Sequence, residues 1–192
     1  ITAGHAFGGD LETVNVYSGL ALAKTMVAAD LIIVAMGPGI VGTGTKYGFS
    51  GIEQAYILEA VEKMGGLPIA VPRISFADPR PRHFGLSHHS QTVLGELTYA
   101  TAYLGLPRWD EEKQRLLVDQ FRDSGLTRHH LYKVEIPAVA QLMADHNLEI
   151  TTMGRAYRDD PAFFEAAAAA GVLAAAFTRA EKPSLPVWPG EE

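Results

Sequence analysis

The chain has 192 residues, of which 47% are hydrophobic and 20% charged, and its net charge is −6, a composition typical of one globular domain. The absence of cysteine excludes disulfides, thiolate metal sites and cysteine nucleophiles, and scattered lysines and arginines argue against a nucleic-acid partner. The apolar stretches are broken short of a membrane span, and no basic region followed by an apolar one opens the chain. We therefore expect a cytoplasmic protein with no membrane partner.

Strands and helices alternate along the chain according to its apolar periodicity and turn residues. In chain order, the predicted elements are a strand at 1–5, a helix within 13–30, a strand at 31–36, a helix at 52–64, a strand at 67–75, a helix at 90–98, a strand at 99–105, a helix at 110–125, a strand at 131–136, a helix at 137–147, a strand at 148–153 and a helix at 160–177. Pro72 indicates a bulge or an edge in its strand. Because the chain opens at Ile1, inside a predicted strand, we expect an N-terminal part to precede it.

This alternation predicts one α/β domain over residues 1–178. The expected architecture has three layers, with a mostly parallel sheet between helices on both faces, in a Rossmann-like, doubly wound arrangement. Residues 179–192 are proline-rich and predict an extended tail anchored by Trp188. In such a sheet, ligands bind beyond the carboxyl ends of the strands. We therefore expect residues 4–12, 37–51, 76–90 and 152–155 to meet at one edge.

A glycine-rich loop follows the apolar run LIIVAM at 31–36, and six of its fifteen residues, 37–51, are glycine. Glycine-rich backbone can adopt positive φ angles, expected here at Gly39, Gly42 or Gly44, and its amides can hold an anion. The predicted ligand-binding residues of this loop are Gly37, Gly39, Gly42, Thr43, Gly44, Thr45 and Lys46. A structural loop that only needs positive φ angles stays a second interpretation.

Two nucleotide-binding motifs fit this loop less well. Residues 37–42 match G-x-G-x-x-G, but the predicted helix begins near Gly51, and Glu62, about twenty residues on, lies within a helix where it could not hold a ribose. Gly39 and Gly44 have P-loop spacing, but Thr45-Lys46 follows where Lys-Ser/Thr is required. A general anion cradle is the better interpretation.

The segment 76–90 is dense in groups that carry chemistry. Arg80 and Arg82 could grip a carboxylate or phosphate. The predicted catalytic residues are His88 or His89 as a proton-transfer group, with Asp78 orienting it. If a metal binds, the predicted ligands are Asp78, His83 and either His88 or His89, since adjacent side chains of regular helices or strands diverge and argue against both.

Further candidate ligand residues follow the first and the last predicted strands of the chain. Asp10 is most simply a helix N-cap, whereas Glu12 or Asn15 could reach a ligand from the first helix. Arg155, at the end of the last predicted strand, is either an anion clamp or a surface charge.

These residues predict an enzyme that acts on a small anionic metabolite, phosphorylated or nucleotide-like. A non-catalytic metabolite-binding or regulatory module is an alternative, and so is a structural partner protein with an apolar patch around the alanine-rich helix at 160–177. The sequence does not identify a cofactor, and it leaves a homo-oligomer open.

The chain resembles the bacterial family known as domain of unknown function 3866. The resemblance rests on AFGGDLETVNVYSGL at 6–20, GPGIVGTGTKYGFSG at 37–51, DPRPRHFGLSHHS at 78–90 and TMGRAYRDDPAFFEAAAAAG at 152–171. It covers nearly the whole chain and implies relatives that are longer than this chain. It supplies no activity, so the functional prediction rests on the residues themselves.

Overall fold

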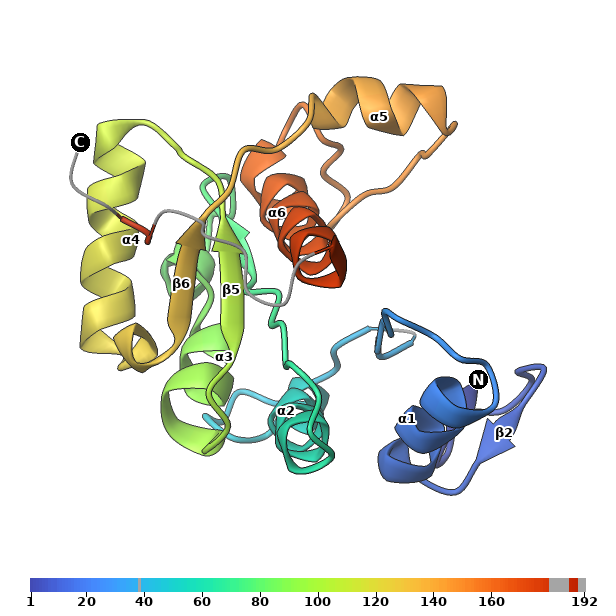
Figure 1. The fold of residues 1–192 in the computed structure, drawn as a ribbon. Coiled ribbons are helices and arrows are strands. Elements are labelled where there is room, and N and C mark those ends of the chain that lie inside the picture. The colour runs from blue at the N-terminus through green and yellow to red at the C-terminus, as the bar shows by residue number, and fades with distance from the viewer. Residues whose placement is uncertain (38, 180–186, 190–192) are drawn as a thin grey trace.

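The computed structural model describes residues 1–37, 39–179 and 187–189. Its elements, in chain order, are β1 (Thr2–Ala3), β2 (Glu12–Thr13), α1 (Val16–Thr25), the 3-10 turn η1 (Ser50–Ile52), α2 (Glu53–Lys63), β3 (Ile74–Ser75), the 3-10 turn η2 (Pro81–His83), β4 (Gly85–Leu86), α3 (His88–Ser90), the π-helical η3 (Gln91–Leu97), β5 (Tyr103–Leu106), α4 (Glu111–Asp123), the 3-10 turn η4 (Leu126–Arg128), β6 (His130–Lys133), α5 (Val139–Asp145) and α6 (Pro161–Arg179). Figure 1 shows their arrangement.

The strands of the described residues form three separate two-stranded sheets. β1 pairs with β2 in parallel, β3 with β4 antiparallel, and β5 with β6 in parallel from Tyr103 opposite His130 to Leu106 opposite Lys133. Single bridges from Ile69 to Tyr103 and from Val187 to Tyr132 extend the last pair. The predicted three-layer, Rossmann-like, doubly wound sheet is therefore wrong.

Two predicted strands account for much of this difference. Residues 31–36 belong to no strand, and Ile33 is 84% exposed, so the expected buried strand does not form. Residues 148–153 contribute only a bridge from Thr152 to Arg155. An apolar run becomes a strand only where another strand offers hydrogen-bond partners, and within the described chain neither run has one.

The core lies around the β5–β6 pair, between α4 and α6 (Figure 1). Leu104 and Leu106 of β5 are fully buried, as is Leu117 of α4. On the other side α6 contacts β5 closely, because a Cβ added to Gly105 would lie 2.5 Å from the carbonyl oxygen of Ala169. The absence of a side chain at Gly105 thus sets the distance between strand and helix.

α6 is the one helix of the described chain that is long and apolar enough to cross a membrane. Core helices have the same two properties, and α6 packs on β5. Its buried residues are Ala162, Phe164, Ala166, Ala169, Ala170 and Leu173. The expectation that every apolar stretch is too short to span a membrane is thereby corrected, while the cytoplasmic location stays a prediction.

The two ends of the chain are attached differently. β1, β2 and α1 form a small N-terminal unit at one side of the molecule, and its α1 contacts α2 (Figure 1). At the other end Trp188 is 2% exposed, lies 5.1 Å from Phe121 between ring centroids, and donates its backbone N–H to Leu131 O. The predicted anchoring by Trp188 is confirmed, although residues 180–186 and 190–192 of the predicted tail lie outside the described residues.

The predicted helix at 90–98 is present as α3 continued by η3. Arg128 donates to the carbonyl oxygens of Leu94 and Thr98, and the buried His129 bridges Leu94 O and the N–H of Ala102. These contacts satisfy backbone groups at the end of the helix. They fix the helix whose first residues are His88 and His89.

Candidate functional site

Three histidines gather where η2, β4 and α3 follow one another. His83 ends η2 and is 3% exposed, whereas His88 and His89 begin α3 and are half-buried. Each offers one ring nitrogen, and these three nitrogens lie within 4.8 Å of one another. The ring centroids are 4.8 Å apart for His83 and His88, and 4.2 Å apart for His88 and His89. We call these three residues the histidine cluster.

Ser87 holds two members of the cluster in place. Its hydroxyl lies 2.8 Å from His83 Nδ1 and accepts a hydrogen bond from the His89 backbone N–H at 3.3 Å. The Nε2 atom of His88 is buried and has no hydrogen-bond partner among the described residues. A buried polar atom without a partner is unusual and marks a position where a ligand or ion could bind.

The end of the glycine-rich loop covers one side of the cluster. The Phe49 ring stacks on His89 with a centroid distance of 4.1 Å and an interplanar angle of 20°, and it lies 6.3 Å from His88. Residues 37–51 and 76–90 are thus neighbours, as the sequence predicted. Their contact is made by an aromatic ring.

Burial and nearby positive charge favour the neutral form of all three imidazoles. Burial, followed by the charge of Arg80, lowers the pKa of His83 to about 4. Burial also lowers the pKa of His89 to about 4, and burial with the charges of Arg82 and Arg80 lowers the pKa of His88. At neutral pH the cluster therefore presents nitrogen lone pairs, which both a proton acceptor and a metal ligand require.

Asp78 lies beside the cluster, in an ion-pair network with arginines. Arg80 donates to both of its carboxylate oxygens, at 2.9 and 2.8 Å, and Arg155 donates at 3.3 Å, while Arg73 lies 3.7 Å away. The hydrogen bond from Arg80 holds the pKa of Asp78 well below its usual range. Asp160 continues the network, accepting from Arg155 at 3.1 Å and from Ser75 at 2.7 Å. The network joins residues 73–80 to residues 152–160.

Because of these pairings, fewer of the predicted arginines are available to bind an anion. Arg80 and Arg155 are bound to carboxylates, and Asp78 lies outside the group of possible metal ligands. Arg82 is exposed and has no hydrogen-bond or ion-pair partner in the described chain, and its charge acts on His88 and His89. Of the three predicted arginines, only Arg82 has a guanidinium that no described residue pairs with.

The glycine-rich loop uses many of its polar groups internally. Gly39 has a φ of +119°, which confirms a positive φ in the predicted set. The backbone N–H of Thr43 donates to Gly48 O, and that of Thr45 donates to the Thr43 hydroxyl. Lys46 pairs with Glu96 at 2.7 Å. This arrangement gives no support to an anion cradle at Gly37, Gly42, Gly44 and their neighbours, which stays a prediction.

The three N-terminal candidates do not reach the histidine cluster. Asn15 is the N-cap of α1, with a reciprocal bond to Ser18, so it takes the role expected of Asp10. Glu12 accepts from the Gly8 N–H at 3.1 Å, and Asp10 is exposed. All three belong to the N-terminal unit, whose described contact with the remaining elements is made by α1 on α2. Contacts join 37–51 to 76–90 and join 76–90 to 152–155, but the described residues form no common sheet edge, so the predicted meeting of four loops at one edge is wrong.

Comparison with known proteins found one matching protein family. A family model described as "Protein of unknown function (DUF3866)" matches residues 1–171. The chain belongs to this family. No curated protein and no solved structure matches it.

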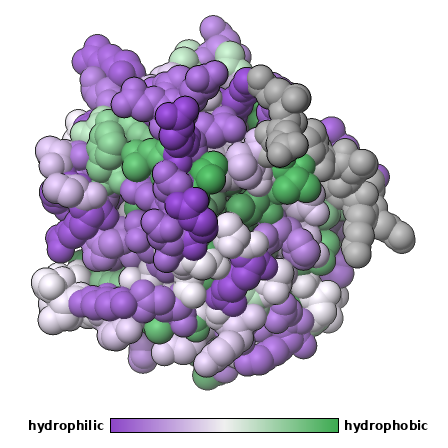
Figure 2. Space-filling view, turned by 90° about the vertical axis from the view of Figure 1, so that its left-hand side faces the viewer, coloured by the Kyte–Doolittle hydropathy of each residue, from purple (hydrophilic) through white to green (hydrophobic). Residues whose placement is uncertain are grey.

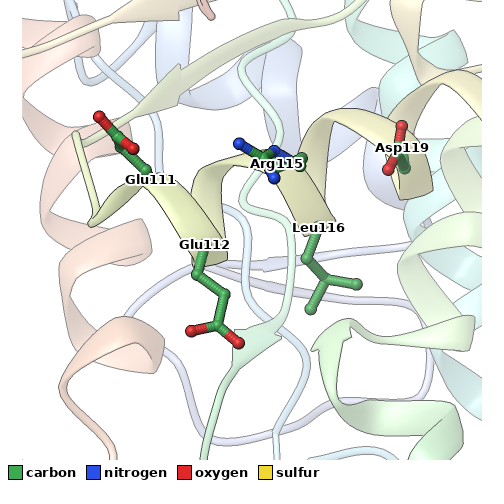
Figure 3. Close-up of a pocket in the computed structure, with 5 residues that line it drawn as sticks. All are labelled: Glu111, Glu112, Arg115, Leu116 and Asp119. Carbon is green, nitrogen blue, oxygen red and sulfur yellow. The ribbon is translucent and has the colours of Figure 1, made fainter.

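Two open depressions lie on or near α4 in this DUF3866 chain. One is lined by five residues that all come from α4, Glu111, Glu112, Arg115, Leu116 and Asp119, so no second element closes it (Figure 3). The side of the molecule that carries α4 is mostly hydrophilic, with smaller separate hydrophobic areas (Figure 2). The other depression is bordered by Asp78, Pro81 and Phe84 on one side and by Leu116 and Gln120 of α4 on the other, next to the histidine-bearing segment.

Sequence reasoning missed several residues that shape the site. Ser87 carries a local signal, because it precedes a helix and serves as its N-cap. Phe49, Arg73 and Asp160 carry no local signal for these roles, since each contacts a residue far along the chain: His89, Thr152 and Ser75, respectively. Their roles depend on tertiary contacts.

Proposed function

We propose that this protein is an enzyme that acts on a small anionic metabolite at the histidine cluster. One observation carries the proposal: the guanidinium of Arg82 has no partner among the described residues, and its positive charge contributes to the lowered pKa of His88 and of His89. A group that can bind an anion and groups that can accept a proton are thus neighbours.

The chemistry of these groups supports the proposal. A guanidinium binds phosphate or carboxylate through two parallel hydrogen bonds, and it stays charged at any physiological pH. A neutral imidazole accepts a proton, and His88 has a ring nitrogen that no described residue occupies. The half-buried rings are partly reachable from solvent, so a small ligand held by Arg82 could approach them.

The test compares Arg82→Gln with Arg115→Gln. Arg115 is an exposed arginine of α4 and is not among the charges that shift the histidine pKa values. Binding of a panel of phosphate- and carboxylate-containing metabolites would be measured by calorimetry. Loss of a charge-assisted hydrogen bond, about 1.5–3 kcal/mol, should weaken binding about tenfold or more in Arg82→Gln.

Arg115→Gln should bind the same ligand as tightly as the unmodified protein. Equal affinity in all three proteins would contradict a role for Arg82. A ligand that binds through Arg82 but is not converted would support the alternative of a non-catalytic metabolite-binding module.

A further inference from the structure

We propose that His83, His88 and His89 together bind one divalent transition-metal ion such as zinc. The proposal concerns the same site as the proposed function and rests on it only in the identity of the fourth ligand. A bound metal would take the imidazole lone pairs that the proposed function uses to accept a proton, and a metal-bound hydroxide would then act in their place. Three neutral imidazoles with a remaining open position are a common ligand set of catalytic zinc sites.

The backbone removes the objection raised by adjacent histidines. Side chains of neighbouring residues diverge within a regular helix or strand. His88 and His89 instead begin α3 directly after the non-helical N-cap Ser87, with φ of −59° and ψ of 138°, and their ring centroids are 4.2 Å apart. Both rings therefore face His83, at centroid distances of 4.8 and 5.2 Å.

The nitrogen geometry is close to what a metal requires. In a tetrahedral site with bonds of about 2.1 Å, ligand nitrogens lie about 3.4 Å apart. Because the three nitrogens lie within 4.8 Å of one another, ring rotations that move each by less than about 1 Å would bring them to bonding distance.

Hydrogen bonds outside the cluster prepare the rings for a metal. The Ser87 hydroxyl occupies His83 Nδ1, which fixes that ring and leaves its Nε2 available. Metal-binding histidines commonly use their second nitrogen in this way. The buried, unpartnered Nε2 of His88 would gain a partner, and the desolvation of that atom would be offset by coordination.

The surrounding charge indicates the fourth ligand. Three imidazoles are neutral, so the metal would keep its double positive charge next to Arg80 and Arg82, both of which act on the histidines. An anion at the open position would relieve this repulsion. Hydroxide or the anionic group of the metabolite meets that need, and a metal-bound hydroxide is a nucleophile at neutral pH.

The experiment uses untagged, chelator-treated protein and the metal alone. Zinc binding is measured by calorimetry, and cobalt(II) serves as a probe because its visible spectrum reports ligand number and geometry. We expect one ion per chain, and we expect His88→Gln and His89→Gln each to weaken zinc binding at least tenfold and to change the cobalt spectrum. His146→Gln and His5→Gln, at exposed positions outside the cluster, should do neither.

His83→Gln provides a third variant, and since His83 is buried, its folding must be checked by circular dichroism. If His83→Gln does not fold, the His88→Gln and His89→Gln variants still decide the test. Absence of stoichiometric zinc binding, or binding that survives in both His88→Gln and His89→Gln, would overturn the metal site. Anion binding through Arg82 is measured separately on metal-free protein, so either proposal can fail while the other stands.

Discussion

Gly95 shows how a single missing side chain decides the packing between η3 and the end of α4. A Cβ built on Gly95 would lie 1.9 Å from the carbonyl oxygen of Ser124. That oxygen belongs to the backbone and cannot rotate away. Helical propensity alone would favour alanine here, by about 0.5–1 kcal/mol, but the steric contact opposes it.

Gly95→Ala should therefore lower the free energy of unfolding by about 2 kcal/mol, as measured by urea denaturation at neutral pH. Gly171→Ala is the matched control, because Gly171 lies in α6 and an added Cβ meets no atom within 4 Å. That variant should gain about 0.5–1 kcal/mol from helical propensity. If both glycines respond alike, the close approach of Ser124 to Gly95 does not exist in solution.

At the scale of elements, the arginine–aspartate network holds together segments that share no sheet. Asp78 has no exposed side-chain area and faces the guanidinium groups of Arg73, Arg80 and Arg155. Arg155 lies 77 residues away in sequence and also binds Asp160 at the start of α6. The same network lies beside the histidine cluster, so it positions the segment that carries the candidate site.

Asp78→Asn removes the central negative charge while keeping the side-chain shape. Three guanidinium groups would then lack their shared anion, and we expect the free energy of unfolding to fall by about 3 kcal/mol. Asp119→Asn is the control, because Asp119 pairs with Arg122 at the surface of α4 and is 50% exposed. Its loss should change stability by less than about 1 kcal/mol. Urea denaturation would reveal the difference, and equal effects would argue against a buried network.

At the scale of the whole molecule, residues 187–189 pack beside β6 and α4 and complete the hydrophobic core. Trp188 is almost fully buried against Phe121, while the preceding Val187 is 66% exposed and bridges Tyr132. The docking adds a large aromatic side chain to a core whose other described members lie between Phe49 and Ala166. Removing that side chain leaves a cavity between the segment and α4.

Trp188→Ala should lower the free energy of unfolding by about 3 kcal/mol. Unfolding would be monitored by circular dichroism, because the variant loses a tryptophan and its fluorescence changes for that reason alone. Val187→Ala, at the exposed neighbouring position, should stay within about 0.5 kcal/mol of the unmodified chain. A Trp188→Ala variant as stable as Val187→Ala would mean that the end of the chain does not complete the core.

The amino-acid sequence by itself determined most helices, because helix signals are local. Asp110 accepts from the Lys113 N–H as an N-cap, and Pro161 opens α6, so α4 and α6 lie close to where capping and periodicity predicted them. The two strands of the β5–β6 pair were also predicted from the sequence, as strands at 99–105 and 131–136 with a helix between them along the chain. The presence of reactive groups in residues 76–90 is likewise visible in the sequence.

Only the tertiary structure decided the sheets and the arrangement of the site. LIIVAM at 31–36 has the composition of a buried strand, but strand formation requires backbone partners from elsewhere, and the described chain brings none to it. Whether Arg80 and Arg82 are free or paired depended on where Asp78 came to lie. The approach of His88 and His89 to His83 depended on the path through β4 and Ser87, which residue spacing does not encode.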